Sequence, residues 1–298
     1  MLLIAGGESD PNVASVLGRM RWRGIDGREL LVGVANPGLT WDFQSDSLRV
    51  DGEEVRPAAV FLRYDVFSTL ADERPPVTFR AQAWFTTLHG WIQAHPGVRA
   101  LNRHATGGAN KPHILHTAKR IGLRIPFTLI TNELDALEAD ASRLGPMIAK
   151  PVPGGGFAQD VGELLAKTPR REGRSAAPAF VQRRMEAPEV RIYGVGRESA
   201  RRFIPFRVES DALDYRADAE SRVVHLPLDT VDAEAVEGLG RLMDTLEMDY
   251  GAADFKTCPE TGRLVFLEIN SGPMFSAFDE VSGWAVSDAI LDYLTGSG

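Results

Sequence analysis

The opening stretch of the chain constrains the fold more than any other segment. "MLLIAGGESDPNVASVLGRMRWRGID" begins with an apolar run, turns at two glycines, and then places Val13, Val16, Leu17 and Met20 at helical spacing. A buried strand followed by an amphipathic helix is the repeating unit of α/β proteins. The runs "ELLVGVA" and "AAVFLR" repeat the buried-strand pattern. The sequence therefore predicts a small parallel or mixed α/β layer at the N-terminus.

The composition is that of an ordinary globular protein. The chain has 298 residues, 44% of them hydrophobic, which suffices for a sizeable core and two or three domains. Its 33 basic and 41 acidic residues give a formal charge of -8, so we expect no nucleic-acid partner. Cys258 is the single cysteine, and we find neither a signal peptide nor a membrane-spanning run. We therefore expect a cytoplasmic protein with no membrane partner.

Glycine, proline and polar clusters divide the rest of the chain. Asp51-Gly52 predicts a hairpin within "DSLRVDGEEV", and a helical pattern ends near His95, before a loop rich in glycine and asparagine. We expect the polar segment "AKTPRREGRSAAP" to be a linker and a single helix to end the chain. The domain boundaries that we predict are 1–98, 99–176 and 177–298.

The segment "MIAKPVPGGGFAQD" carries the first candidate for chemistry. A strand ends at Lys150 and runs into Gly154, Gly155 and Gly156. Glycines allow backbone N–H groups to approach an anion and a lysine neutralises its charge, so this pattern suits a polyphosphate. No G-K-[ST] follows, so it is not a Walker loop, and an exposed turn is an equally good interpretation of this segment alone.

The segment "RLVFLEINSGPMF" carries the second candidate. Glu268 and Asn270 lie two residues apart in an apolar strand and therefore project from the same face. Two oxygen ligands on one face could bind a metal ion. Taken alone, the pair also fits the solvated face of an edge strand.

The order of these segments resembles the ATP-grasp superfamily. The chain presents Lys111, Lys150, the glycine loop, "FVQRRMEAPEVR", "ADF" and "LEIN" in that order. The resemblance implies an α/β (α+β) ATP-grasp fold of three domains, with ATP held between the central and C-terminal domains. It also implies the binding residues. For ATP these are Lys111, Lys150, Gly154, Gly155, Gly156, Gln182, Arg183, Met185 and Glu189, and for Mg²⁺ they are Asp254, Glu268 and Asn270.

Further segments resemble one branch of that superfamily. "FLRYD", "LNRHATGGANKPHILHTAKRIGLRIPFTLITN" and "FIPFRVESDALDYRAD" are similar to ligases related to RimK, and most of all to the maturases that crosslink ribosomal peptides. In such enzymes ATP phosphorylates a carboxylate and a nucleophile captures the acyl phosphate. The resemblance makes Arg191 and Arg216 candidates for binding the carboxylate, with Arg207 and Arg63 in second place. For each arginine a surface salt bridge is an equally good interpretation.

The chain departs from the maturase pattern after Asn270. It reads "SGPMFSAFDEVSG" where maturases usually continue with a glycine, glutamine and aromatic segment. With no evident peptide-docking insertion, we expect a small amino-acid-like substrate. The combination is similar to ATP-grasp enzymes of antibiotic biosynthesis that close O-ureido-D-serine to D-cycloserine. Asp279 and Glu280 could act as a base at the acceptor site, although a carboxylate at a helix N-terminus is the commoner role.

Two other functions stay open from the sequence. The first is a peptide-modifying ligase that forms macrolactones or macrolactams with the same chemistry. The second is a non-catalytic ATP-binding protein, against which the joint presence of Asp254, Glu268 and Asn270 argues. Members of the superfamily often form homodimers, and no residue pattern here decides the oligomeric state.

Overall fold

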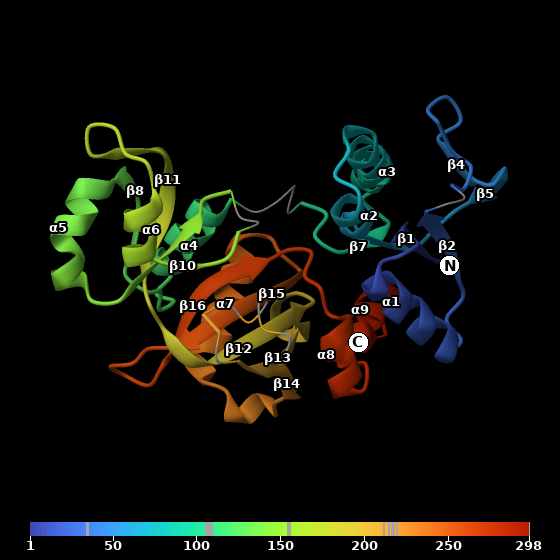
Figure 1. Ribbon diagram of the computed structural model, residues 1–298. Helices are drawn as coiled ribbons and strands as arrows, with labels where there is room; N and C mark the ends of the chain where they lie inside the picture. Colours follow the sequence, from blue (N-terminus) through green and yellow to red (C-terminus); the bar gives the residue numbers. More distant parts are fainter. Residues whose placement is uncertain are drawn as a thin grey trace.

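The computed structural model describes residues 1–33, 36–104, 110–153, 156–210, 212–213, 215, 218 and 220–297. Within these residues the strands form four sheets, arranged along an elongated molecule (Figure 1). No helix in these ranges is both long and apolar enough to cross a membrane.

The N-terminal sheet is parallel and has the order β2-β1-β6-β7. Both of its faces are buried: Leu2 and Ile4 pack against α1 and α9 (Ala285–Thr295), whereas Leu3 and Ala5 pack against α3. This two-sided burial explains the unbroken apolar run at the N-terminus. The elements of this part are β1 (Leu2–Gly7), α1 (Pro11–Trp22), β2 (Gly27–Val32), β6 (Ala59–Leu62), α2 (Val66–Ala71), α3 (Pro75–Ala94) and β7 (Arg99–Ala100).

A small antiparallel sheet is inserted between β2 and β6. Its strands are β3 (Leu39–Asp42), β4 (Ser47–Val50) and β5 (Glu53–Val55). Val50 pairs with Glu53, and the two intervening residues, Asp51 and Gly52, have φ angles of 52° and 82°. Positive φ at both central positions is what a two-residue hairpin turn requires. The hairpin predicted at Asp51-Gly52 is confirmed.

A second four-stranded sheet, with the order β10-β9-β11-β8, is antiparallel and is covered by two helices. Its elements are β8 (Thr128–Glu133), α5 (Leu134–Leu144), β9 (Met147–Pro151), β10 (Gln159–Asp160), α6 (Val161–Lys167) and β11 (Arg174–Arg183). The expected linker is wrong in its second half, because β11 already begins at Arg174, which pairs with Glu133. The exposed, polar start of this strand hides it from an analysis of apolar patterns.

The largest sheet is antiparallel and has the order β14-β13-β12-β15-β16. Helices α4 and α7 pack on one face of it, and α8 and α9 cover part of the other. Its elements and neighbours are α4 (Lys111–Arg120), β12 (Glu186–Val195), η1 (Glu198–Ala200), β13 (Arg202–Glu209), β14 (Arg222–His225), η3 (Leu228–Thr230), α7 (Ala233–Thr245), β15 (Tyr250–Thr257), β16 (Leu264–Asn270), α8 (Ser276–Ser282) and α9 (Ala285–Thr295).

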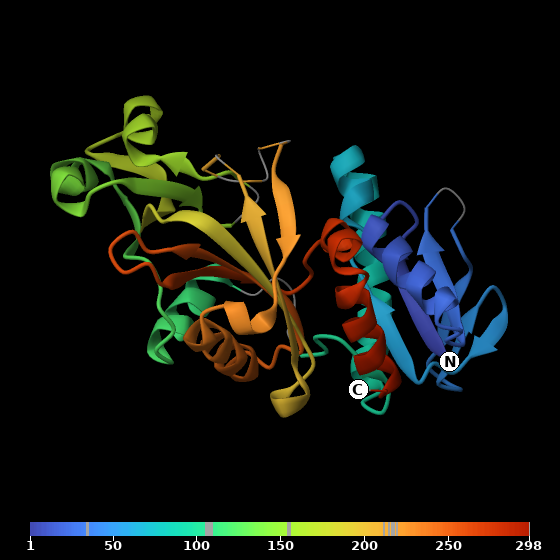
Figure 2. The ribbon, with the colours of Figure 1, turned by 90° about the horizontal axis from the view of Figure 1, so that it is seen from below.

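Two helices, not one, end the chain. Gly283 and Trp284 both have positive φ, which ends α8 and starts α9 in a new direction. The second helix then packs between the largest sheet and the N-terminal layer, where Ile290 shares a core with Ile4 of β1 and Val16 of α1. Figure 2 shows these red helices beside the blue elements of the N-terminal layer.

The domain boundaries predicted from the sequence stay a prediction. The cores of the molecule do not follow the chain order strictly: α9 completes the N-terminal core, and α4 packs on the largest sheet, away from the sheet that contains β8 and β9.

The packing of α9 leads to a stability prediction. Ile290 is fully buried between the two sheets, so Ile290→Ala should remove about 2 to 5 kcal/mol from the free energy of unfolding. Val281→Ala, on the exposed side of α8, is the matched control and should change it by less than about 0.5 kcal/mol. Denaturant unfolding followed by circular dichroism measures both, and equal effects would contradict the role of α9 in the core.

Candidate functional site

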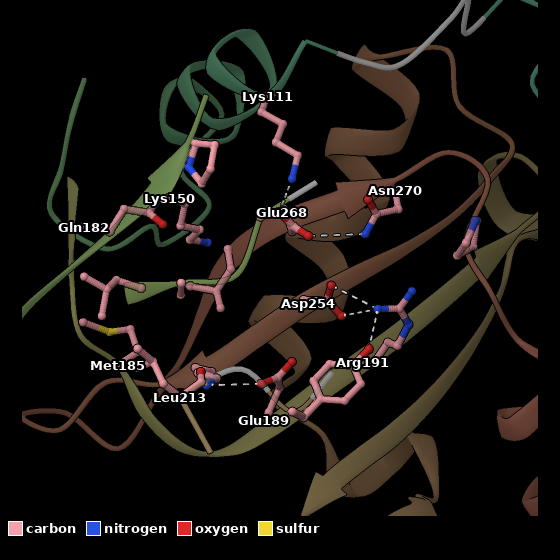
Figure 3. A pocket seen from close by; sticks show the side chains of 18 of the residues that line it. Lys111, Lys150, Gln182, Met185, Glu189, Arg191, Leu213, Asp254, Glu268 and Asn270 are labelled. Atoms are coloured by element: carbon pink, nitrogen blue, oxygen red, sulfur yellow. Dashed lines mark hydrogen bonds and ion pairs between the residues drawn. The ribbon is translucent and has the colours of Figure 1, made fainter. Parts of the chain in front are cut away.

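A cavity of about 700 Å³ lies between the second four-stranded sheet and the largest sheet. Most of the residues predicted from the sequence to bind a ligand line it (Figure 3). Among the described residues its charged lining is unbalanced, because basic side chains outnumber acidic ones two to one. The basic residues are Lys111, Lys150, Arg183, Arg184, Arg191 and Lys256, and the acidic residues are Glu189, Asp254 and Glu268. Such a cavity attracts anions.

One face of the largest sheet changes from apolar to charged along its strands. On β12, Tyr193 lies under the C-terminal helices, and Arg191 and Glu189 follow at two-residue spacing toward the cavity. On β15, Ala252 lies in the same core, whereas Asp254 and Lys256 line the cavity. Strand alternation thus places these four charged side chains on the face that continues beyond the helices.

Asp254, Glu268 and Asn270 lie together at the floor of the cavity. Asp254 pairs directly with Glu268 across β15 and β16, and Asn270 is two residues further on the same face. The Asn270 side-chain nitrogen is 3.5 Å from the Glu268 carboxylate. In the described part of the chain no cluster of three His, Cys, Asp or Glu side chains is suited to a metal ion, and the group here consists of two carboxylates and one amide. Three hard oxygen donors fit Mg²⁺, which keeps its other positions for water and phosphate.

Two lysines face these carboxylates. Asn110 caps α4 and so fixes Lys111 in its first turn, where its ammonium is 2.8 Å from the Glu268 carboxylate. Lys150 comes from β9 on the opposite wall. Burial raises the pKa of Glu268, but the charges of Lys111 and Lys150 and the hydrogen bonds from Lys111 and Asn270 together outweigh burial, and the pKa lies below its ordinary value. Glu268 therefore stays ionised and able to bind a cation.

Arg191 forms a buried ion pair with Asp254. One guanidinium nitrogen donates to both carboxylate oxygens, at 2.8 and 3.1 Å. The Tyr193 and Tyr215 hydroxyls accept further bonds from Arg191 at 3.1 and 3.3 Å. Burial lowers the pKa of Arg191, but Asp254, Tyr193 and Tyr215 together outweigh burial and raise it, so the guanidinium stays protonated. Burial raises the pKa of Asp254, and Arg191 opposes that rise.

The segment that joins the two sheets forms the far end of the cavity. Gln182 is buried and donates to the Thr128 hydroxyl at 3.1 Å, and Met185 is buried beside it. Arg183 pairs with Glu260. Glu189 accepts from Lys256 at 3.2 Å. The apolar part of this end is formed by Ile148, Met185 and Leu267, which suits a flat ring.

The segment after β16 is held by hydrogen bonds from three directions. Arg63 donates to the Pro273 carbonyl at 2.8 Å and pairs with buried Asp10. Burial raises the pKa of Tyr193, so its hydroxyl keeps its proton and donates to the Met274 carbonyl at 2.6 Å. The Asn12 side chain accepts from the backbone N–H groups of residues 275 and 276. Arg63 therefore positions a wall of this cavity but is not among the residues that line it.

The remaining predicted residues are distributed differently. Gly156 lines the cavity, whereas Gly154, Gly155 and Arg216 lie outside the described residues. Arg207 pairs with Glu209 on β13. It is also the direct strand partner of Val190, so the side chains of both residues lie on the face of the sheet that packs against α4 and α7, away from the cavity. The catalytic role predicted for Arg207 thus stays a prediction that this geometry does not favour.

The two C-terminal carboxylates have different surroundings. Asp279 is fully buried and accepts from the backbone N–H groups that begin α9, at 3.0 and 3.1 Å, whereas Glu280 is exposed. Asp279 therefore caps a helix, which is the commoner of the two roles weighed from the sequence.

Among the polar residues that line or support the cavity, Arg184, Tyr193, Tyr215 and Lys256 were not predicted from the sequence. The signal for Lys256 was available, because it stands two residues after Asp254 on the same strand. The alternation that selected Glu268 and Asn270 would have selected it as well.

The pair between Lys111 and Glu268 leads to a pH prediction. Since the pKa of Glu268 is lowered on folding, its ionised form stabilises the folded state above its ordinary pKa of 4.5, and this stabilisation is lost as the pH falls through the lowered pKa. Lys111→Met should therefore destabilise most at neutral pH and least in acid, as measured by denaturant unfolding across that range. Lys167→Met removes an exposed lysine paired with Glu163 and should show little pH-dependent loss. A Lys111→Met effect that does not change with pH would contradict the pairing.

The pair between Arg191 and Asp254 leads to a second stability prediction. Arg191→Met leaves a buried carboxylate without its partner and should cost about 3 to 5 kcal/mol of unfolding free energy. Adding Asp254→Leu should recover most of that loss, because an apolar pair has no charge to desolvate. Denaturant unfolding of the single and double variants tests this, and a double variant as unstable as the single one would refute it.

Comparison with known proteins identifies the fold. No protein-family model and no curated protein sequence matches the chain. The ATP-grasp ligase PsnB, solved with a minimal precursor, matches with a TM-score of 0.77 and 24% identity, over 99% of this chain and 98% of PsnB. The macrocyclase MdnC from Microcystis aeruginosa MRC, solved with the precursor peptide MdnA, matches with a TM-score of 0.67 and 18% identity over 99% of each chain.

The similarity extends to a ligase of small amino acids. VanG D-Ala:D-Ser ligase from Enterococcus faecalis matches with a TM-score of 0.64 and 15% identity, over 99% of this chain and 98% of VanG. All these structures share one architecture with the chain over almost its whole length. The chain has the ATP-grasp fold, and the fold predicted from the sequence is confirmed.

Proposed function

We propose that the protein is an ATP- and Mg²⁺-dependent carboxylate–amine ligase that acts through an acyl phosphate. One observation carries the proposal: two carboxylates and an amide on adjacent strands face two lysines inside a cavity with a mainly basic lining. A phosphate chain with a bound cation matches this alternation of charges. The ATP-grasp fold supports the proposal.

The residues of the cavity divide into groups that suit the parts of ATP. Lys111 and Lys150 would contact the phosphates, and Gly156 lies at the same wall. Gln182, Arg183 and Met185 would hold the adenine ring, and Glu189 would accept hydrogen bonds from the ribose.

The metal site belongs to the same arrangement. Asp254, Glu268 and Asn270 would hold Mg²⁺, which offsets phosphate charge during phosphoryl transfer. Arg191, beside Asp254, would bind the carboxylate that is to be activated, because a guanidinium pairs well with planar oxyanions.

The reaction that we propose has two steps. A carboxylate oxygen of the substrate attacks the γ-phosphorus, ADP leaves, and an acyl phosphate forms. An amine then attacks the acyl carbon, phosphate leaves, and the amine loses its proton. The basic lining would hold the developing negative charge, and exclusion of water would protect the acyl phosphate from hydrolysis.

The acceptor that we propose first is a small amino-acid-like molecule. In this proposal the carboxylate and the nitrogen nucleophile belong to one molecule, O-ureido-D-serine. The ureido nitrogen that is bonded to oxygen attacks the acyl carbon and phosphate leaves. Water then removes the carbamoyl group as carbon dioxide and ammonia, which leaves the ring of D-cycloserine. A cavity of about 700 Å³ is large enough for a nucleotide and a small second substrate.

A peptide substrate is the second candidate, and a specific observation favours it. PsnB and MdnC, which match this chain with TM-scores of 0.77 and 0.67, were solved with a precursor or precursor peptide. A peptide would reach the same carboxylate site but would extend beyond the cavity.

The experiment that tests the proposal is phosphate release from ATP and Mg²⁺ with a panel of acceptors. The panel contains D- and L-amino acids, O-ureido-D-serine and short acidic peptides, and mass spectrometry identifies each product. We expect turnover with at least one acceptor, and the acceptor that supports it decides between the small-molecule and peptide candidates. Tight binding of ATP without turnover on any acceptor would instead support a non-catalytic ATP-binding protein.

Variants test the metal assignment in the same assay. Glu268→Ala and Asn270→Ala each remove an oxygen ligand and should lower turnover at least about 100-fold, since even indirect support of a metal site is worth 10- to 100-fold. Glu163→Ala, at an exposed position of α6, is the control and should keep full turnover. Undiminished turnover in both ligand variants would refute the metal site.

A further inference from the structure

Lys256 lies at the edge of the candidate nucleotide site without a role in the arrangement described so far. Its ammonium is 3.2 Å from the Glu189 carboxylate and 3.0 Å from the carbonyl oxygen of Leu213. The side chains of Lys256 and Glu189 are 16% and 11% exposed. Figure 3 shows Glu189 next to Leu213 at the end of the cavity away from Lys111. Lys256 therefore joins a strand of the sheet to the segment that follows β13.

The pair stands at the junction of two cavities. Glu189, Leu213 and Lys256 line the main cavity and also a smaller one of about 200 Å³. The three groups thus form part of the wall between the two spaces. A change in their positions would alter the shape of the main cavity next to Glu189.

A stabilising role explains this pair poorly. Removing an ammonium and a carboxylate from water costs about as much as their attraction returns, so buried ion pairs add little net stability. A lysine has three donors, of which two are accounted for by Glu189 and Leu213. The ammonium thus holds the Glu189 carboxylate in one place at the edge of the cavity.

We propose that Lys256 is a positioning residue that fixes Glu189 for the ribose hydroxyls of the nucleotide and so makes the site select ribonucleotides. The inference rests on the proposed function, because it needs a nucleotide in this cavity. Lys256 acts through Glu189 and does not contact the reacting atoms. Its bond to the Leu213 carbonyl keeps the neighbouring wall in place at the same time.

The test is calorimetric titration of the whole protein with ADP, 2′-deoxy-ADP and 3′-deoxy-ADP in the presence of Mg²⁺. A hydrogen bond to a charged group contributes about 1.5 to 3 kcal/mol, so the wild type should bind ADP about tenfold or more tightly than at least one deoxy analogue. In Lys256→Met that preference should shrink to less than about threefold. Lys256→Arg, which keeps the charge, should retain most of it.

Two variants complete the experiment. Glu189→Gln should lose the preference, and combining it with Lys256→Met should change the preference no further, because both act on the same contact. Lys167→Met removes a lysine from a lysine–glutamate pair on α6 and should bind all three nucleotides as the wild type does.

Each contrary outcome has a separate meaning. A wild type that binds no ADP refutes the proposed function itself. The positioning role is overturned if the wild type shows the ribose preference and Lys256→Met keeps that preference in full. It is also overturned if Lys256→Met weakens the binding of all three nucleotides equally. A Glu189→Gln variant that keeps the preference, or a wild type that shows none, overturns the contact with the ribose and with it the inference.

Discussion

The pairing of two neighbouring carboxylates on one face of the largest sheet with separate cations is the constraint on which the rest of the site depends. Asp254 and Glu268 are direct neighbours across two strands, and two like charges at that distance repel. The structure resolves this by giving each carboxylate its own cation, Arg191 for the first and Lys111 for the second. Because the two cations come from different elements, the pairing also fixes how α4 and β12 lie around the site.

The same sheet face has two functions, which the order of residues along each strand separates. Near α8 and α9 it is aromatic, and Tyr193 and Phe206 pack edge to face with Phe278. Toward the cavity it is ionic. Tyr193 belongs to both regions, since its ring lies in the core and its hydroxyl bonds Arg191 and the Met274 carbonyl. The rigid core thereby holds the guanidinium that faces the cavity, which is how a precise site is best supported.

The features that depend on residues close together in the sequence were predicted correctly. The features that depend on the register between distant strands were not. Alternation along one strand sufficed to place Glu268 and Asn270 on a common face, and the turn residues sufficed for Asp51-Gly52. No local pattern contains the pairing of Asp254 with Arg191, because it depends on the register of β12 against β15. The polar start of β11 and the turn at Trp284 were missed for a related reason, since tertiary packing overrides weak local preferences there.

The paired charges also determine how ligands would enter the proposed site. In the structure, Glu268, proposed as a metal ligand, pairs with Lys111, proposed to contact the phosphates. Asp254, the other carboxylate proposed for the metal, pairs with Arg191, proposed to bind the substrate carboxylate. A cation at Asp254 and Glu268 would compete with Lys111 and Arg191, and a phosphate at Lys111 would compete with Glu268. Binding of the metal would therefore free Lys111 for the phosphate, and binding of the phosphate would free Glu268 for the metal. By linkage, metal and nucleotide would each strengthen the binding of the other. Likewise, Arg191 would become available to a substrate carboxylate only once a cation had taken its place at Asp254, which would favour binding of the metal nucleotide before the acceptor.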